Sequence, residues 1–168
     1  MPLTRAELIA RLDSLGIASQ TVEHRAVFTV EDNNGVKIGL PGADTKNLFL
    51  KDDKGGLVLV VAKTTTRVDL KALARKLGNG RFSFGKPELL MEVLGVTPGS
   101  VTAFAIVNDH QGRVKVILDD LLRPHNTVNC HPLENTATTN IARDDLLRFI
   151  RACGHEPSIA MLCAAAPP

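Results

Sequence analysis

The sequence predicts a mixed α/β (α+β) domain in which helices pack around a mostly antiparallel mixed sheet. Two observations predict this class: strand-like and helix-like segments are interspersed, and several neighbouring strand-like segments are joined by tight turns. The chain has 168 residues, of which 44% are hydrophobic, and this suits one domain with its own core. We expect a single domain over residues 1–163 and a frayed tail over residues 164–168.

The N-terminal segment predicts a capped helix. Thr4 is a good N-cap, and Glu7 completes a capping box three residues later. The leucines between Leu8 and Leu15 fall on one face, and Gly16 suits a left-handed stop. A second, short helix is expected to open at residues 29–32.

Strands are expected where β-branched and apolar residues cluster between turn residues. The run Leu57–Val61 is continuous, so we expect a central strand that is buried on both faces. Val101–Val107 and Val114–Leu118 are expected to form a hairpin. The remaining strands are expected at residues 36–40 and 46–50, on either side of a turn at 41–44, and at residues 127–130, 138–141 and 159–162.

Three further helices are predicted in the second half of the chain. One runs from a cap at Asp69 to Gly78, and another has Pro87 in its first turn and ends near Gly95. The last carries an apolar stripe at helical spacing from Leu146 to Cys153.

The composition excludes several classes of protein. There is no run of 18 apolar residues and no N-terminal signal core, so we expect a cytoplasmic protein without a membrane span. Cys130, Cys153 and Cys163 form no ligand or disulfide pattern. The net charge of +2 tolerates a polyanionic partner without requiring one. With six Phe and neither Trp nor Tyr, a platform that stacks several bases would be hard to build.

Four segments carry the functional signal: Thr45–Asp52, Gly99–Ala105, His131–Thr136 and Gly154–Pro157. In their order and spacing they resemble the YbaK/prolyl-tRNA synthetase editing-domain superfamily, in particular its free-standing prolyl-tRNA deacylase branch of the ProX/PrdX type. The resemblance runs from about Leu8 to Leu162. It implies a fold in which a curved sheet forms a partly closed barrel.

Lys46 places a cationic side chain at the mouth of an apolar strand. A solvated lysine at a strand end would explain it equally simply. An ammonium group is also a compact point charge that suits a phosphate or a developing oxyanion. The resemblance implies that this lysine contacts the terminal adenosine region of an aminoacyl-tRNA.

Gly99 opens a second candidate site segment. A plain turn before a strand is one interpretation, and Pro98 favours it. The other is a backbone cradle, because glycine lets the main chain approach a ligand closely. The family motif is Gly-x-x-x-Pro, and this chain has Ala103 where proline is usual.

His131 is the third candidate catalytic residue. It could orient the substrate amine or the attacking water, or it could be a satisfied structural histidine. His24, His125 and His155 are weaker candidates, and Cys130 lies in an alternating strand that predicts a small buried residue. No three-ligand pattern predicts a metal, and no cofactor motif is found.

The resemblance implies catalytic roles for Lys46, Gly99 and His131. It implies substrate binding by a larger set, which comprises Phe28, Ser100, Val101, Thr102, Ala103, Asn135 and Thr136. It implies hydrolysis of the ester that joins alanine to the 3′ adenosine of mischarged tRNA(Pro), with the tRNA's own ribose hydroxyl assisting.

Two alternatives stay open. One is a cysteinyl-tRNA deacylase of the YbaK type, and the other is a non-catalytic module that binds the tRNA acceptor end or a synthetase. The expected partner is the acceptor end of aminoacyl-tRNA(Pro), with prolyl-tRNA synthetase or an elongation factor as a further candidate. No cofactor, metal or membrane is expected.

Overall fold

The computed structural model describes residues 1–26 and 39–163. Strands and helices are interspersed along the chain, as the sequence predicts. The strands are β1 (Ser19–Glu23), β2 (Ala43–Asp52), β3 (Leu57–Lys63), β4 (Phe82–Phe84), β5 (Val114–Asp119), β6 (Thr127–Cys130), β7 (Ala137–Ala142) and β8 (Ser158–Ala160). The helices are α1 (Arg5–Ser14), α3 (Leu70–Leu77), α4 (Pro87–Leu94) and α5 (Arg143–Ala152), and the 3-10 segments are η1 (Pro98–Ser100), η2 (Ala103–Asn108) and η3 (Asp120–Leu122).

The strands form one mixed sheet in the order β1-β7-β6-β2-β3-β5-β8, with β4 paired to β2. Four pairings are antiparallel (β1–β7, β6–β7, β2–β3 and β2–β4). Three are parallel (β2–β6, β3–β5 and β5–β8). The predicted mixed, mostly antiparallel sheet is therefore confirmed. Within the described residues the pairing ends at β1 and β8, so the sheet is open where the resemblance implies a partly closed barrel.

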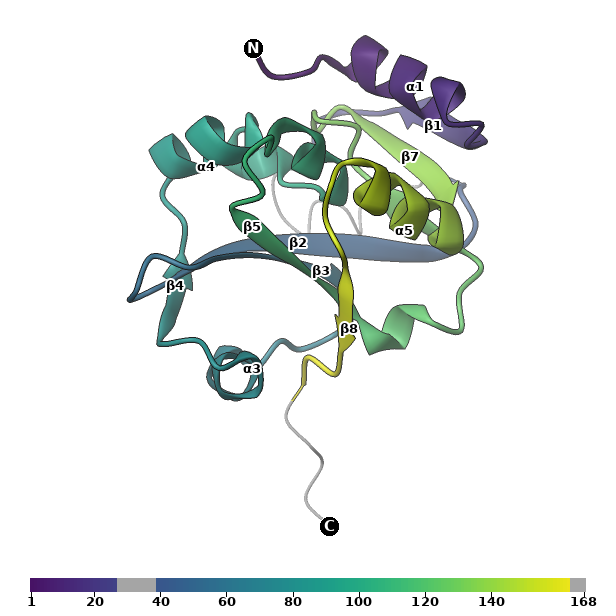
Figure 1. Cartoon of the computed structure of the whole chain (residues 1–168). Coiled ribbons are helices and arrows are strands. Elements are labelled where there is room, and N and C mark those ends of the chain that lie inside the picture. The colour runs from purple at the N-terminus through teal and green to yellow at the C-terminus, as the bar shows by residue number, and fades with distance from the viewer. Residues whose placement is uncertain (27–38, 164–168) are drawn as a thin grey trace.

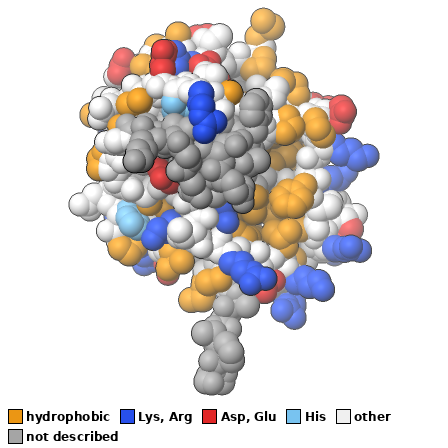
Figure 2. All heavy atoms as spheres, turned by 180° about the vertical axis from the view of Figure 1, so that it is seen from behind, with side chains coloured by type: hydrophobic (Ala, Val, Ile, Leu, Met, Phe, Trp, Pro, Cys, Tyr) orange, Lys and Arg blue, Asp and Glu red, His pale blue; other side chains and the backbone are white. Residues whose placement is uncertain are grey.

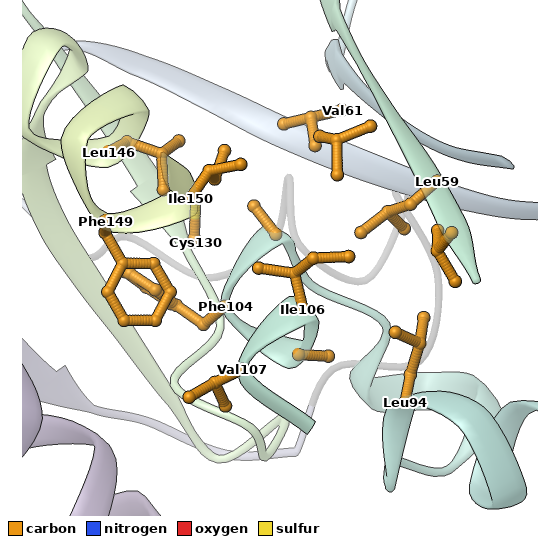
Figure 3. Close-up of a cluster of buried hydrophobic side chains, with 14 of the residues drawn as sticks. Leu59, Val61, Leu94, Phe104, Ile106, Val107, Cys130, Leu146, Phe149 and Ile150 are labelled. Carbon is orange, nitrogen blue, oxygen red and sulfur yellow. The ribbon is translucent and has the colours of Figure 1, made fainter. Parts of the chain in front are cut away.

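The sheet buries both of its faces over much of its area (Figure 1). On one face α1, α4, α5 and η2 enclose the larger core, in which the Phe104 and Phe149 rings meet edge to face at a centroid distance of 5.5 Å (Figure 3). On the other face α3 covers a smaller core that contains Leu50, Val60 and Leu73. The central strand β3 contributes to both cores, which confirms the prediction made from Leu57–Val61.

The local helix signals are confirmed. Thr4 and Glu7 form the predicted capping box at α1. Asp69 caps α3 by accepting from the backbone of Ala72, and Gly78 ends it with φ +71°. Each signal lies within a few residues of the helix end that it specifies, so neighbouring chain segments do not override it.

The predicted strand at 101–107 is wrong. Residues Ala103–Asn108 form the 3-10 helix η2, and Thr102 caps it by accepting from the backbone N–H of Phe104. Residues 103–107 are all buried, so their apolar run carries no two-residue alternation that could separate a strand from a helix.

Two other boundaries are also corrected. The expected turn at 41–44 is shorter, because β2 begins at Ala43, and the last strand covers Ser158–Ala160 in place of 159–162. The helix expected at 29–32 and residues 36–38 of the first expected strand lie outside the described residues. Residues 39–40, the remainder of that expected strand, are described and do not form a strand. Among the described helices, none is long and apolar enough to cross a membrane.

Candidate active site

His131 directly follows the end of β6 and is half-buried. Its Nδ1 lies 3.0 Å from the backbone oxygen of Ala137. Because a carbonyl can only accept, Nδ1 must donate, and the neutral ring therefore has its lone pair on Nε2. Burial lowers the pKa of His131 below its usual 6.5; the carbonyl of Ala137 opposes this, and positive charge on His24 adds to the lowering. A neutral base with a fixed tautomer is thus present at neutral pH.

His24 follows β1 and lies beside His131, with the two ring centroids 6.3 Å apart. Its Nδ1 lies 2.7 Å from the backbone oxygen of Arg25, so this nitrogen donates as well. Its Nε2 lies 2.8 Å from the Thr138 hydroxyl. The two imidazoles are therefore held by consecutive residues of β7, Ala137 and Thr138. The sequence makes His24 only a weaker candidate and does not predict this pairing.

Lys46 lies in β2, half-buried, with Ala62 of β3 as its register partner. It forms no ion pair within the described residues. The parallel pairing of β2 with β6 aligns Asp44 with Asn129. Lys46 and His131 each lie two residues beyond this pair, so the parallel pairing brings both to the same end of β6. The structure thus supports a common location for these two candidates.

Asn47, the next residue of β2, is a site candidate that sequence reasoning missed. Its Oδ1 is buried and has no hydrogen-bond partner within the described residues. Its register partner is Val61 of the larger core, so it faces away from Lys46. A buried acceptor without a donor is costly, and a bound group that donates to it would explain its retention. The signal in the sequence was an amide directly before the apolar run Leu48–Leu50.

The segment that begins at Gly99 forms two short 3-10 turns. Gly99 lies in η1, with its backbone outside the positive-φ region that only glycine adopts readily. Thr102 and Ala103 are fully buried, Ser100 is 6% exposed and Val101 packs against the larger core. Within the described residues, no hydrogen bond joins this segment to Lys46 or His131. Any contact with a ligand would therefore come mainly from its backbone.

The loop between β6 and β7 carries two more predicted residues. Asn135 is half-buried and Thr136 is exposed, with its hydroxyl donating to Glu134 at 3.0 Å. The backbone oxygen of Thr136 accepts from the N–H of His24, which ties this loop to the histidine pair. Phe28, the remaining predicted residue, lies outside the described residues.

Cys130 is not available as a nucleophile at neutral pH. It is 2% exposed, and burial raises the pKa of its thiol to about 11, although the Thr45 hydroxyl acts in the opposite direction. Figure 3 shows its side chain directed into the larger core near Leu146 and Ile150. In the part of the chain that the structure describes, no three His, Cys, Asp or Glu residues are grouped so as to hold a metal.

The chain is similar in sequence to a known protein family and to several known proteins. The model of the aminoacyl-tRNA editing domain matches residues 24–149. The prolyl-tRNA editing protein ProX of Acetoanaerobium sticklandii is 36% identical over 149 residues, which cover 88% of this chain and 91% of that protein. Prolyl-tRNA synthetase associated domain-containing protein 1 of Bos taurus is 39% identical over 160 residues, which cover 92% and 93%.

A solved structure agrees on the fold. The crystal structure of a proposed trans-editing enzyme for prolyl tRNA synthetase superposes with a TM-score of 0.72 at 21% identity, over 98% of this chain and 100% of that one. The family match begins at His24 and includes Lys46 and His131. The chain belongs to the aminoacyl-tRNA editing domain family.

Proposed function

We propose that this aminoacyl-tRNA deacylase acts in trans on mischarged Ala-tRNA(Pro) and hydrolyses the ester at the 3′-terminal adenosine. The name of its ProX relative supports prolyl-tRNA as the RNA, and prolyl-tRNA synthetase is a candidate partner for delivery. The choice of alanine rests on the motif resemblance alone.

The observation that carries the proposal is the fixed tautomer of His131. Its Nδ1 donates to Ala137, so Nε2 is free to accept a proton from the attacking water or to hold the substrate amine. The ester is already activated, so a positioned weak base is enough and no protein nucleophile is needed. Lys46, which like His131 lies two residues beyond the Asp44–Asn129 pair, supplies positive charge for the terminal phosphate or for the developing oxyanion.

The backbone of the Gly99 segment is assigned to the substrate ribose or carbonyl, beside the ribose hydroxyl that assists from the tRNA itself. Asn135 and Thr136 are assigned to the rim of the aminoacyl pocket. These roles follow from the motif match and from the proximity of Thr136 to the histidine pair.

The test measures the initial rate of ester hydrolysis for Ala-, Ser-, Cys- and Pro-tRNA(Pro), with the same tRNA in all four substrates. We expect alanine to be removed well ahead of proline, because a pocket excludes a larger side chain by clash, whereas it rejects an added hydroxyl only weakly. Serine should be intermediate. Equal rates on alanine and proline would refute size exclusion, and a clear preference for cysteine would move the assignment to the YbaK type.

The catalytic assignment is tested with His131→Ala against His125→Ala as the matched control, since the described His125 ring has no assigned role. The first should lose most of the rate and the second should keep it. A wild-type protein that binds the tRNA but hydrolyses none of the four esters would instead be the non-catalytic binding module.

A further inference from the structure

The positive charge of this chain is concentrated in one segment. Residues 46–86 hold ten Lys and Arg against three Asp, a surplus of seven positive charges. Since the whole chain carries +2, the remainder carries a deficit of five. The small net charge therefore conceals a strongly basic region, which comprises β2, β3, α3 and β4.

The cations of residues 46–86 also differ from those of the rest of the chain in their ion pairing. Outside this segment, six arginines each lie within 4 Å of a carboxylate: Arg5, Arg113, Arg123, Arg143, Arg148 and Arg151. Inside it, none of the ten cations forms an ion pair with any described residue. Two of its three carboxylates are also occupied locally, because Asp52 accepts from the backbone of Gly56 and Asp69 caps α3. The basic charge of the segment is thus left unpaired by the part of the chain that the structure describes.

The unpaired cations share one side of the molecule. α3 turns Leu73 toward the smaller core and exposes Lys71, Arg75 and Lys76. That core lies on the sheet face that also carries Lys46, because Lys46 is the register partner of Ala62. Figure 2 shows Lys and Arg side chains gathered along one edge and the lower end of the molecule, where β4 and α3 lie in Figure 1.

An exposed aromatic ring adds to this surface. Phe84 is 63% exposed, whereas Phe49, Phe82 and the other described phenylalanines are buried. Its register partner is Leu50, so it projects on the same sheet face as α3. It lies between the exposed cations Arg81 and Lys86 in the sequence. Cations around an aromatic ring suit a nucleic acid, in which phosphates alternate with stacking bases.

We propose that this surface, the cationic face formed by α3, β4 and the exposed side chains of residues 51–86, binds the phosphate backbone of the tRNA acceptor arm. It lies on the same sheet face as Lys46, so an RNA bound along it directs its 3′ end toward the histidine pair. The identity of the RNA rests on the proposed function. The binding surface itself rests on the charge distribution and on the absence of ion pairs between these cations and other described residues.

The test replaces Arg67, Lys71 and Arg75 together by Gln. The side chains of these three residues form no hydrogen bond or ion pair within the described residues, and none belongs to the proposed catalytic group. The matched control replaces Arg113, Arg148 and Arg151 by Gln, which removes the same charge from paired positions. The probe is uncharged tRNA(Pro), titrated at several salt concentrations.

Each lost phosphate contact reduces the slope of log Kd against log salt by about 0.7–0.9. We expect the triple variant to bind at least about tenfold more weakly near 0.1 M salt and to lose about two units of slope. The control should change Kd by less than about threefold with its slope intact. Phe84→Ala should weaken binding without changing the slope, because stacking releases no counterions.

Rates of ester hydrolysis then distinguish a failure of this inference from a failure of the proposed function. On Ala-tRNA(Pro) the triple variant should raise KM and keep kcat, and on an alanyl ester of the terminal trinucleotide alone it should match the wild type. An unchanged salt slope, or an equal loss in the control, would overturn the cationic face. The proposal would also be overturned if the triple variant kept its affinity for tRNA but lost its affinity for an acidic protein partner. Weaker tRNA binding without hydrolysis of any ester would keep the surface and reject the deacylase.

Discussion

Replacing His24 by Gln should move the acidic limb of the pH–rate profile to higher pH. His131 must be neutral to accept a proton, so hydrolysis should rise with pH through its pKa. Burial holds this pKa below the usual 6.5, and positive charge on His24 adds to the lowering. Removing that charge leaves the protonated form of His131 less disfavoured, so its pKa must rise. The neutral form, and with it the rate, then appears only at higher pH.

The size of the shift follows from the distance between the rings. Two unit charges 6.3 Å apart repel by about 0.7 kcal/mol in water and by about 2.6 kcal/mol at an effective dielectric constant of about 20. These energies correspond to about 0.5–2 pH units. Both rings are half-buried, so we expect the lower part of this range. Removing the His24 ring also admits water to His131, which acts in the same direction.

The assay is the single-turnover rate on Ala-tRNA(Pro) between pH 5 and 8, together with an NMR titration of the His131 ring. His125→Gln serves as the control and should leave the midpoint in place. Added salt should raise the wild-type midpoint by screening the repulsion and should leave His24→Gln unchanged. A midpoint that stays fixed or falls in His24→Gln would refute the electrostatic coupling of the two histidines.

Three other changes probe separate parts of the molecule. Lys46→Ala should lower the hydrolysis rate by roughly 10²–10³ without unfolding the protein, whereas Lys115→Ala, which changes an exposed lysine of β5, should have little effect; a folded, fully active Lys46→Ala protein would remove this lysine from the site. Asn47→Leu should raise the melting temperature by about 2–4 °C, because it removes a buried acceptor without a donor, and should reduce hydrolysis; a lower melting temperature would indicate that Oδ1 is already satisfied. His155→Phe should lower the free energy of unfolding, measured with urea, by about 1–3 kcal/mol, because it removes the buried contact of 2.9 Å between His155 Nε2 and Asp109 Oδ2, and an unchanged free energy of unfolding would contradict a stabilising hydrogen bond.

The sequence predicted those parts of the fold whose signals are local. The Thr4–Glu7 capping box and the cap at Asp69 specify helix ends within four residues, and both are present. The Ala103–Asn108 segment failed for a physical reason. It is buried on all sides, and complete burial erases the periodicity that distinguishes a strand from a helix.

The histidine pair could not be predicted from sequence spacing. His24 and His131 lie more than a hundred residues apart, and they meet because β1 pairs with β7 from Glu23 to Ala137. Register over that separation depends on the whole sheet and leaves no local mark. The cationic face was missed for a different reason, because the net charge of +2 averages a basic segment with an acidic remainder.

The catalytic groups of the site are sufficient for the proposed reaction, which has a small barrier. Cys130 cannot serve as a thiolate at neutral pH, because burial raises its pKa to about 11. A neutral imidazole, a half-buried ammonium group and backbone N–H groups remain, and each contributes by position rather than by unusual reactivity. These groups are enough to hydrolyse an activated ester. Because they do not distinguish one amino acid from another, we expect the site to hydrolyse any aminoacyl ester that it admits. Selectivity against Pro-tRNA(Pro) must therefore come from the shape of the pocket, and variants that enlarge it should lose discrimination before they lose rate.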